Sequence, residues 1–198
     1  YEIRLSLVDS EMCIRDSQYT NDDLLALYSF SGGVPKYVEL FCDNRVLTVD
    51  GMIDFMVRDN SPFTDEGKNL LIEEFGKNYG TYFSILSAIS GGYNTQTEIE
   101  ALLGEKSLGG YLKRLIEDYN IVVRQRPVFS KEGSQTVRYG ICDNFIHFWF
   151  NYFDRNRSLI EIKNFIGLRK LIKADYPTYS GKILEQYFLS LIHISEPT

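Results

Sequence analysis

Few residues in this chain have types and spacing that could do chemistry. The run Gly32-Gly33-Val34-Pro35 could admit a flat ligand, because glycine lets a backbone come close and proline offers a rigid apolar face. From spacing alone, a plain corner between two helices is the better interpretation. The sequence contains no phosphate-binding loop GxxxxGK[ST], no GxGxxG and no HExxH. The residues by themselves therefore identify no catalytic group.

A second group consists of basic residues that could contact nucleic-acid phosphates: Lys113, Arg114, Arg124, Arg126, Lys131 and Arg138. Next to them, Gly109 and Gly110 offer no side chain to a base edge, and Glu117 and Asp118 would repel a phosphate. The residues thus favour neither DNA binding nor a role in packing and protein contacts. The net charge of −6 disfavours a general coat for nucleic acid, although a local basic patch would still be compatible with it.

Other reactive side chains have simpler interpretations. His147 lies in the aromatic run FIHFWF, where a hydrogen-bonded core histidine explains it better than a ligand or base, and Trp149 is expected in the core. The cysteines, Cys13, Cys42 and Cys142, are odd in number and lack CxxC spacing, which argues against a disulfide framework and a zinc site. With no secretory signal and no apolar run of about 20 residues, the sequence predicts a cytoplasmic protein without a membrane partner.

The elements that would position these residues are mainly helical. Apolar periodicity and helix breakers predict two helices within 22–42, separated at Ser31-Gly32-Gly33, and further helices over 50–57, 64–78, 82–91, 95–104 and 107–119. Two β-type runs follow, 121–129 and 136–141, separated by the polar turn SKEGSQ. Three helices followed by a hairpin is the outline of a winged helix-turn-helix. Helices are then expected over 143–153, 158–173 and 180–188, with a break at Tyr176-Pro177-Thr178.

Both ends of the chain resemble translated sequencing adapters. The head contains LSLVDSEMCIRDS and the tail is LSLIHISEPT. We expect residues 1–17 and 189–198 to be non-native, and residues 18–188 to be natural sequence cut at both ends.

Four stretches in order resemble one architecture. YSFSGGVPKYVELF is similar to the lid of archaeal-type AAA+/STAND-like ATPases, and YFSILSAISGGYNTQTEIEALLG with LGGYLKRLIEDYNIVVRQRPV resembles their winged helix. VRYGICDNFIHFWFNYFDRNRSLIE is similar to the connector that follows, and YSGKILEQYF to the first helix of their PD-(D/E)XK nuclease-like C-terminal domain. The resemblance implies a mainly α fold with a small β-hairpin: a helical lid over 18–78, a winged helix over 79–142, and a helical connector with that first helix over 143–188.

The resemblance also implies functional residues. Gly33 and Pro35 match a Gly-x-Pro element whose proline packs against adenine, and Glu185 matches a carboxylate that helps to bind a metal ion in an intact nuclease-like domain. ATP and Mg²⁺ would be cofactors of the parent protein, whose N-terminal P-loop domain is the missing partner. The fragment would not bind them tightly and would not catalyse a reaction. The rival hypothesis is a stand-alone winged-helix transcription regulator that binds DNA.

Overall fold

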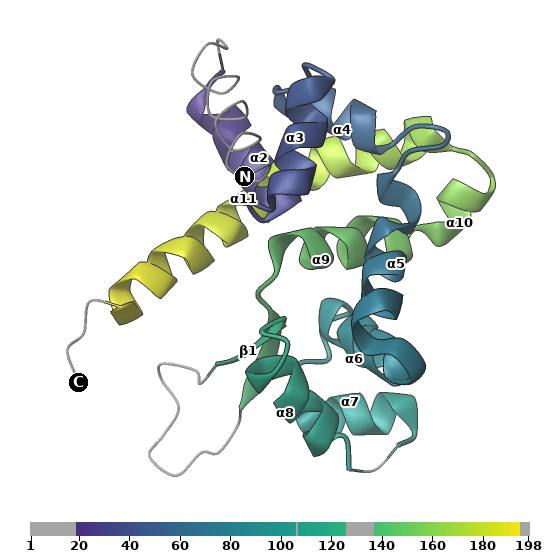
Figure 1. Ribbon diagram of the computed structural model, residues 1–198, viewed down its shortest axis with the longest axis vertical. Coiled ribbons are helices and arrows are strands. Elements are labelled where there is room, and N and C mark those ends of the chain that lie inside the picture. The colour runs from purple at the N-terminus through teal and green to yellow at the C-terminus, as the bar shows by residue number, and fades with distance from the viewer. Residues whose placement is uncertain (1–18, 106, 126–136, 195–198) are drawn as a thin grey trace, which may run out of the picture. The chain divides into compact units, whose positions relative to one another are not determined.

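The described part of the chain is mainly helical. A computed structural model describes residues 19–105, 107–125 and 137–194, with side chains as far as Phe188. Within these ranges the strands form a single two-stranded antiparallel sheet, and the other elements are helices (Figure 1). The structure thus confirms the mainly α class with a small β component.

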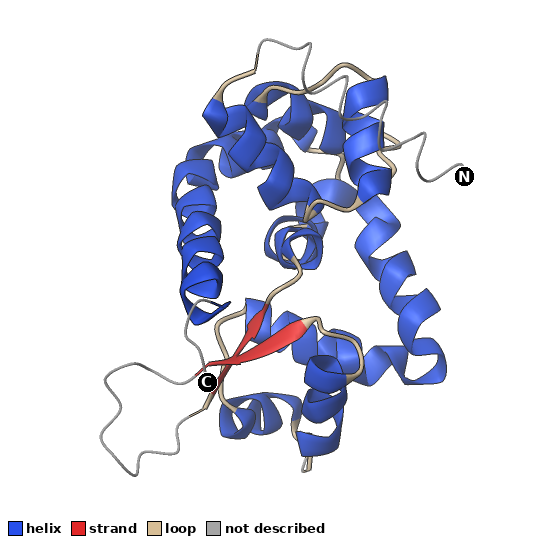
Figure 2. Ribbon diagram, turned by 60° about the vertical axis from the view of Figure 1, so that its left-hand side comes forward, coloured by secondary structure: helices blue, strands red, loops and turns tan. Residues whose placement is uncertain are grey.

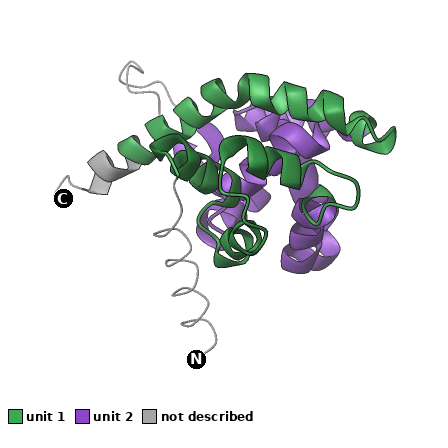
Figure 3. Ribbon diagram, turned by 90° about the horizontal axis from the view of Figure 1, so that it is seen from above, with its two compact units in different colours: residues 1–64, 158–198 green, residues 65–157 purple. Residues whose placement is uncertain are grey.

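The chain divides into two compact units (Figure 3). Unit 1 comprises residues 1–64 and 158–198, and unit 2 comprises residues 65–157. Unit 1 combines segments far apart in the sequence, because the last helix packs with the first helices.

Unit 1 is built from α2 (Asn21–Ser31), α3 (Pro35–Asp43), α4 (Val49–Met56) and α11 (Phe165–Ile194), with α10 (Arg157–Glu161) at its edge. Their starts follow from local chemistry. Thr20 and Asp23 form a capping box at α2, Thr48 Oγ1 accepts from Gly51 N at α4, and Pro35 occupies the first turn of α3.

Aromatic rings and one long apolar stripe fill the core of unit 1. Phe41 stacks on Phe63 with ring centroids 5.4 Å apart, and Phe55 meets both rings edge-on. The buried face of α11 recurs every three to four residues, as expected of a helix packed on one side; it consists of Leu168, Ile172, Tyr176, Tyr179 and Ile183.

Polar ties join elements of unit 1 that are far apart in the sequence. Asp23 Oδ1 accepts from Val49 N at 2.8 Å, which links α2 to α4. The Tyr176 hydroxyl of α11 donates to Asp22 at 3.0 Å. Lys173 Nζ also lies 2.9 Å from Asp50 Oδ1, so α11 is held by charge as well as by its apolar stripe.

Unit 2 contains most of α5 (Phe63–Phe75), then η1 (Gly76–Asn78), α6 (Tyr79–Ser90), α7 (Gln96–Leu103) and α8 (Gly109–Glu117). The strands β1 (Val122–Gln125) and β2 (Arg138–Ile141) follow, paired antiparallel with Val122 opposite Ile141 (Figure 2). The unit ends with α9 (Asn144–Trp149) and the π-helix η2 (Phe150–Asp154).

A glycine lets two elements of unit 2 pack closely in its core. Trp149 is 2% exposed, and a methyl group placed on Gly67 of α5 would overlap its ring. A second cluster surrounds Tyr82, whose ring stacks on Phe75 at 4.3 Å and meets Tyr119 edge-on at 5.6 Å. Trp149 therefore belongs to the core, as the sequence predicted.

The C-terminal helices differ from the prediction. A helix over 158–173 with a break at 176–178 was wrong: the break lies at 162–164, and α11 runs continuously through Pro177. The Asn164 side chain accepts from Gly167 N at 3.0 Å and starts α11. Tyr176 and Tyr179, both buried, hold the helix on either side of Pro177, so packing overrides the preference of proline for a break.

The start of α8 also differs from the prediction. Ser107 does not cap this helix; its φ of 72° places it in the left-handed region, and Leu108 is the N-terminal cap residue. The Glu100 carboxylate accepts from Leu108 N at 2.9 Å and takes the capping role from another helix. The remainder of the first β-type run, residues 126–129, and the SKEGSQ turn lie outside the described residues.

Candidate functional site

The glycine–proline corner has a defined backbone. Gly32 caps α2 in the left-handed conformation with φ 64°, and Gly33 follows with φ 75°, which side chains with a Cβ rarely adopt. The buried Ser31 hydroxyl accepts from Gly33 N at 3.1 Å and donates to Leu27 O. This role of Ser31 was not predicted, although a serine at a helix end before two glycines is a signal for it.

The corner is open on its outer side. Gly33, Val34, Pro35 and Lys36 are exposed, whereas Tyr37, one residue further on, is 3% exposed and anchors the start of α3. A Cβ placed on Gly33 would meet no atom within 4 Å. The two residues that the resemblance assigned to nucleotide binding therefore share one accessible surface with an apolar valine between them.

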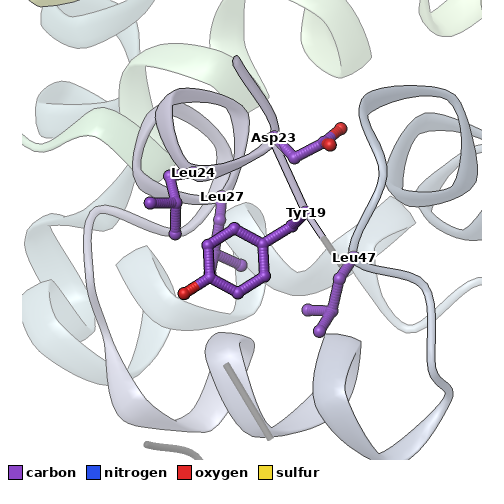
Figure 4. A pocket seen from close by; sticks show the side chains of 5 residues that line it. All are labelled: Tyr19, Asp23, Leu24, Leu27 and Leu47. Atoms are coloured by element: carbon purple, nitrogen blue, oxygen red, sulfur yellow. The ribbon is translucent and has the colours of Figure 1, made fainter. Parts of the chain in front are cut away.

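A small cavity lies at the other end of α2 (Figure 4). It is lined by Tyr19, Asp23, Leu24, Leu27 and Leu47. Its volume of about 10 Å³ is roughly what one water molecule needs, so it is far too small for a purine. This cavity therefore cannot hold the base of a nucleotide.

The Asp23 carboxylate at that cavity has a structural role. Burial raises the pKa of Asp23, but the hydrogen bonds from Thr20 and from Val49 N outweigh it and lower the pKa below its ordinary value. A carboxylate that is ionised and satisfied by three donor groups is a cap, not a catalytic acid.

Four of the predicted basic residues lie at exposed positions of unit 2. Lys113 and Arg114 are on α8, and Arg124 and Arg138 are on the paired strands. Because the two strand arginines are offset by one register position, their side chains leave opposite faces of the sheet. Arg126 and Lys131 lie outside the described residues.

Carboxylates accompany three of these four described cations. Lys113 Nζ lies 3.6 Å from Glu117 Oε2. Arg138 attracts the carboxylate of Glu98, and Asp118 attracts Arg114. The positive potential that would attract a phosphate is therefore reduced.

Arg114 also contacts the core of unit 2. The nearby Tyr82 hydroxyl, followed by the Asp118 carboxylate, raises the pKa of Arg114. The Tyr82 oxygen is nevertheless buried without a hydrogen-bond partner among the described residues, Arg114 included.

Glu185 is exposed on α11. Among the described residues no three histidine, cysteine, aspartate or glutamate side chains gather in a way that could hold a metal ion. Within the same residues, no helix is both long and apolar enough to cross a membrane.

Comparison with known proteins relates the chain to a longer protein. It is 33% identical over 174 residues to the uncharacterized protein MJECL04 of Methanocaldococcus jannaschii. The match covers 83% of this chain and 36% of the relative, so the chain spans about a third of the length of the curated relative that it matches. No protein-family model and no solved structure matches the chain. Because the relative's name states no activity, the function has to be argued from the site.

Proposed function

We propose that the chain is part of an ATP-binding protein of the AAA+/STAND-like class, in which the corner of unit 1 contacts the purine. The observation that carries this proposal is the exposure of Gly33, Val34 and Pro35. No described atom lies within 4 Å of a Cβ placed on Gly33. A flat base could rest on Val34 and Pro35 while the glycine backbone admits its edge. The greater length of the relative leaves room for a phosphate-binding domain, which the chain itself does not contain.

In this proposal, unit 2 supplies the element that nucleotide state would reposition. Three helices, α6 to α8, followed by β1 and β2 have the order of a winged helix. The longer protein would supply the phosphate cradle and the Mg²⁺ ligand, and the present chain would bind ATP weakly because its sequence contains no phosphate-binding loop. Glu185 would serve as a metal ligand only together with further carboxylates of a complete nuclease-like domain.

The test uses the complete reading frame that contains these residues and measures the Kd of a fluorescent ATP analogue with Mg²⁺. Gly33→Ala and Pro35→Ala should each weaken binding by about fivefold, the equivalent of roughly 1 kcal/mol of lost contact. Gly104→Ala is the matched control, because Gly104 also has a left-handed φ, 65°, and open space around it, but lies in unit 2. Equal affinity in all four proteins, or an upstream sequence without a P-loop, would refute the proposal.

A second candidate function is DNA binding by unit 2 as a winged-helix regulator. The exposed Arg124 and Arg138 on the paired strands favour it, and the carboxylates beside three of the four described cations weigh against it. Random duplex DNA titrated at two salt concentrations distinguishes the two. If both arginines contact phosphates, the double variant R124A/R138A should reduce the slope of log K against log salt by about 2, whereas Arg45→Ala in unit 1 should leave it unchanged. Absence of salt-dependent binding by the unmodified protein would end this candidate.

A further inference from the structure

The chain passes between the two units at two places. The first lies inside α5 after Thr64, and the second lies at the start of α10 after Arg157. Within unit 1, the residues next to these crossings are held by different interactions, and this difference suggests a function for one exposed ion pair.

Buried aromatic rings hold the first crossing. Phe63 opens α5, is 1% exposed, and packs on Phe41 and Phe55 with centroids 5.4 and 6.0 Å away. Its N–H donates to the buried Ser61 hydroxyl at 3.3 Å. Core packing therefore anchors the first turn of α5 in unit 1.

The second crossing lacks such an apolar anchor. The short helix α10 contributes no buried residue, and the side chains of Ile162 and Ile166, on either side of the loop to α11, are 71% and 67% exposed. Lys163, in that loop, has φ 56°, an uncommon conformation for a residue with a Cβ. Apart from the half-buried Leu159 and Ile160 of α10, apolar burial contributes little to holding this segment.

An ion pair joins this loop to the one before α5. Lys163 Nζ lies 3.2 Å from Asp59 Oδ2, next to Asn60, which is also left-handed with φ 54°. The pair continues a series in which acidic groups of the α4 segment face basic groups of the α11 segment. The series includes Asp54–Arg169 at 3.9 Å, and Lys173 at 2.9 Å from Asp50 and 3.1 Å from Asp54.

We propose that Asp59 and Lys163 form a clasp that sets the direction in which the second crossing leaves unit 1, and whose opening releases it. Both side chains are more than half exposed, so the pair is weak and sensitive to salt. A weak clasp suits a switch, because a charged ligand or a change in ionic strength can open it without unfolding either unit. The clasp depends on unit 1 alone and not on nucleotide binding.

The experiment measures the distance distribution between two spin labels in the 198-residue protein. The labels replace Thr178, exposed on α11 of unit 1, and Ala101, exposed on α7 of unit 2, in a background with Cys13 and Cys142 changed to serine. K163E and D59K should each broaden the distribution. The population of distances that are rare in the unmodified protein should rise by about 1.5- to 5-fold, as expected for loss of an exposed ion pair. The charge-swapped double variant D59K/K163E should restore the original width.

Lys170→Glu is the matched control, because it makes the same change of charge on an exposed residue of α11 one turn beyond Ile166. It should leave the distribution unchanged. A K163E distribution that coincides with that of K170E, or a double variant as broad as the single ones, would overturn the clasp. Neither result bears on ATP affinity, so the clasp and the proposed function can fail independently.

Discussion

The two units have aromatic cores of similar composition but are closed by different means. In unit 1, α11 returns to the first helices through polar ties, from Tyr176 to Asp22 and from Lys173 to Asp50. In unit 2, α5 comes close to Trp149 because Gly67 has no side chain. Changes of charge should therefore perturb unit 1, whereas the packing of unit 2 is best perturbed by a change of volume.

The candidate sites differ in a related way. The corner of unit 1 combines an exposed apolar surface with a backbone that Ser31 and two glycines define. The basic residues of unit 2 lie among carboxylates such as Glu117 and Asp118. A preorganised corner suits one small ligand, and this contrast is why the nucleotide proposal is preferred to DNA binding.

Loss of a core ring should have the largest effect and should act mainly on unit 1. Phe41 is fully buried and stacks on Phe63, so Phe41→Ala should lower the stability of unit 1 by about 3–5 kcal/mol. The chain has one tryptophan, Trp149 in unit 2, so its fluorescence reports unit 2 while circular dichroism reports helices of both units. The dichroism transition should shift to lower urea more than the fluorescence transition. Equal shifts would mean that the units unfold as one and would remove the comparison.

A methyl group added to the core of unit 2 should lower the stability of that unit. Gly67→Ala places a methyl group in the Trp149 ring, and overpacking of this kind costs roughly 1–3 kcal/mol. The matched control is Gly80→Ala in α6, where a Cβ meets open space and better helix propensity should add up to about 1 kcal/mol. Urea denaturation followed by Trp149 fluorescence measures both variants. A Gly67→Ala protein as stable as the control would show that the two elements can move apart freely.

The sequence predicted the local features well because they depend on a few neighbouring residues. The stop at Ser31-Gly32-Gly33, the start of a helix at residue 143 and the antiparallel pairing of the β-type runs all agree with the structure. Each of these features is specified by residues within a few positions or by alternation along a short run.

Features that depend on distant residues could not be predicted in this way. Continuity of α11 through Pro177 depends on the burial of Tyr176 and Tyr179, and the start of α8 depends on Glu100 from the preceding helix. The proximity of Tyr82 to Arg114 likewise exists only after the fold has formed. Periodicity measures which face of a helix is apolar, not what that face meets.

Removal of the Asp23 charge should lower the stability of unit 1 by an amount that depends on pH. The folded-state pKa of Asp23 is lowered, so its ionised form adds stability that is present above the pKa of the unfolded chain and is lost as pH falls through the folded pKa. Asp23→Asn should therefore cost about 1 kcal/mol at neutral pH, a typical value for a lost cap. The difference from the unmodified protein should disappear in acid. Stability curves of both proteins against pH, followed by circular dichroism, measure it; parallel curves would contradict the role of the charge.

The smallest effect should come from Asp154 in unit 2, and its sign should be opposite. Burial raises the pKa of Asp154, and the Ser87 hydroxyl, 3.2 Å from its Oδ2, compensates this only in part. The ionised form therefore carries a cost in the folded state that is absent below the pKa of the unfolded chain and complete above the folded pKa. Asp154→Asn keeps an acceptor for Ser87 and should stabilise unit 2 by less than about 1 kcal/mol at neutral pH, with no gain in acid. Trp149 fluorescence in urea at both pH values measures the gain. If Asp154→Asn instead destabilised unit 2 at neutral pH, its carboxylate would be a structural tie like Asp23, and charge would close both units.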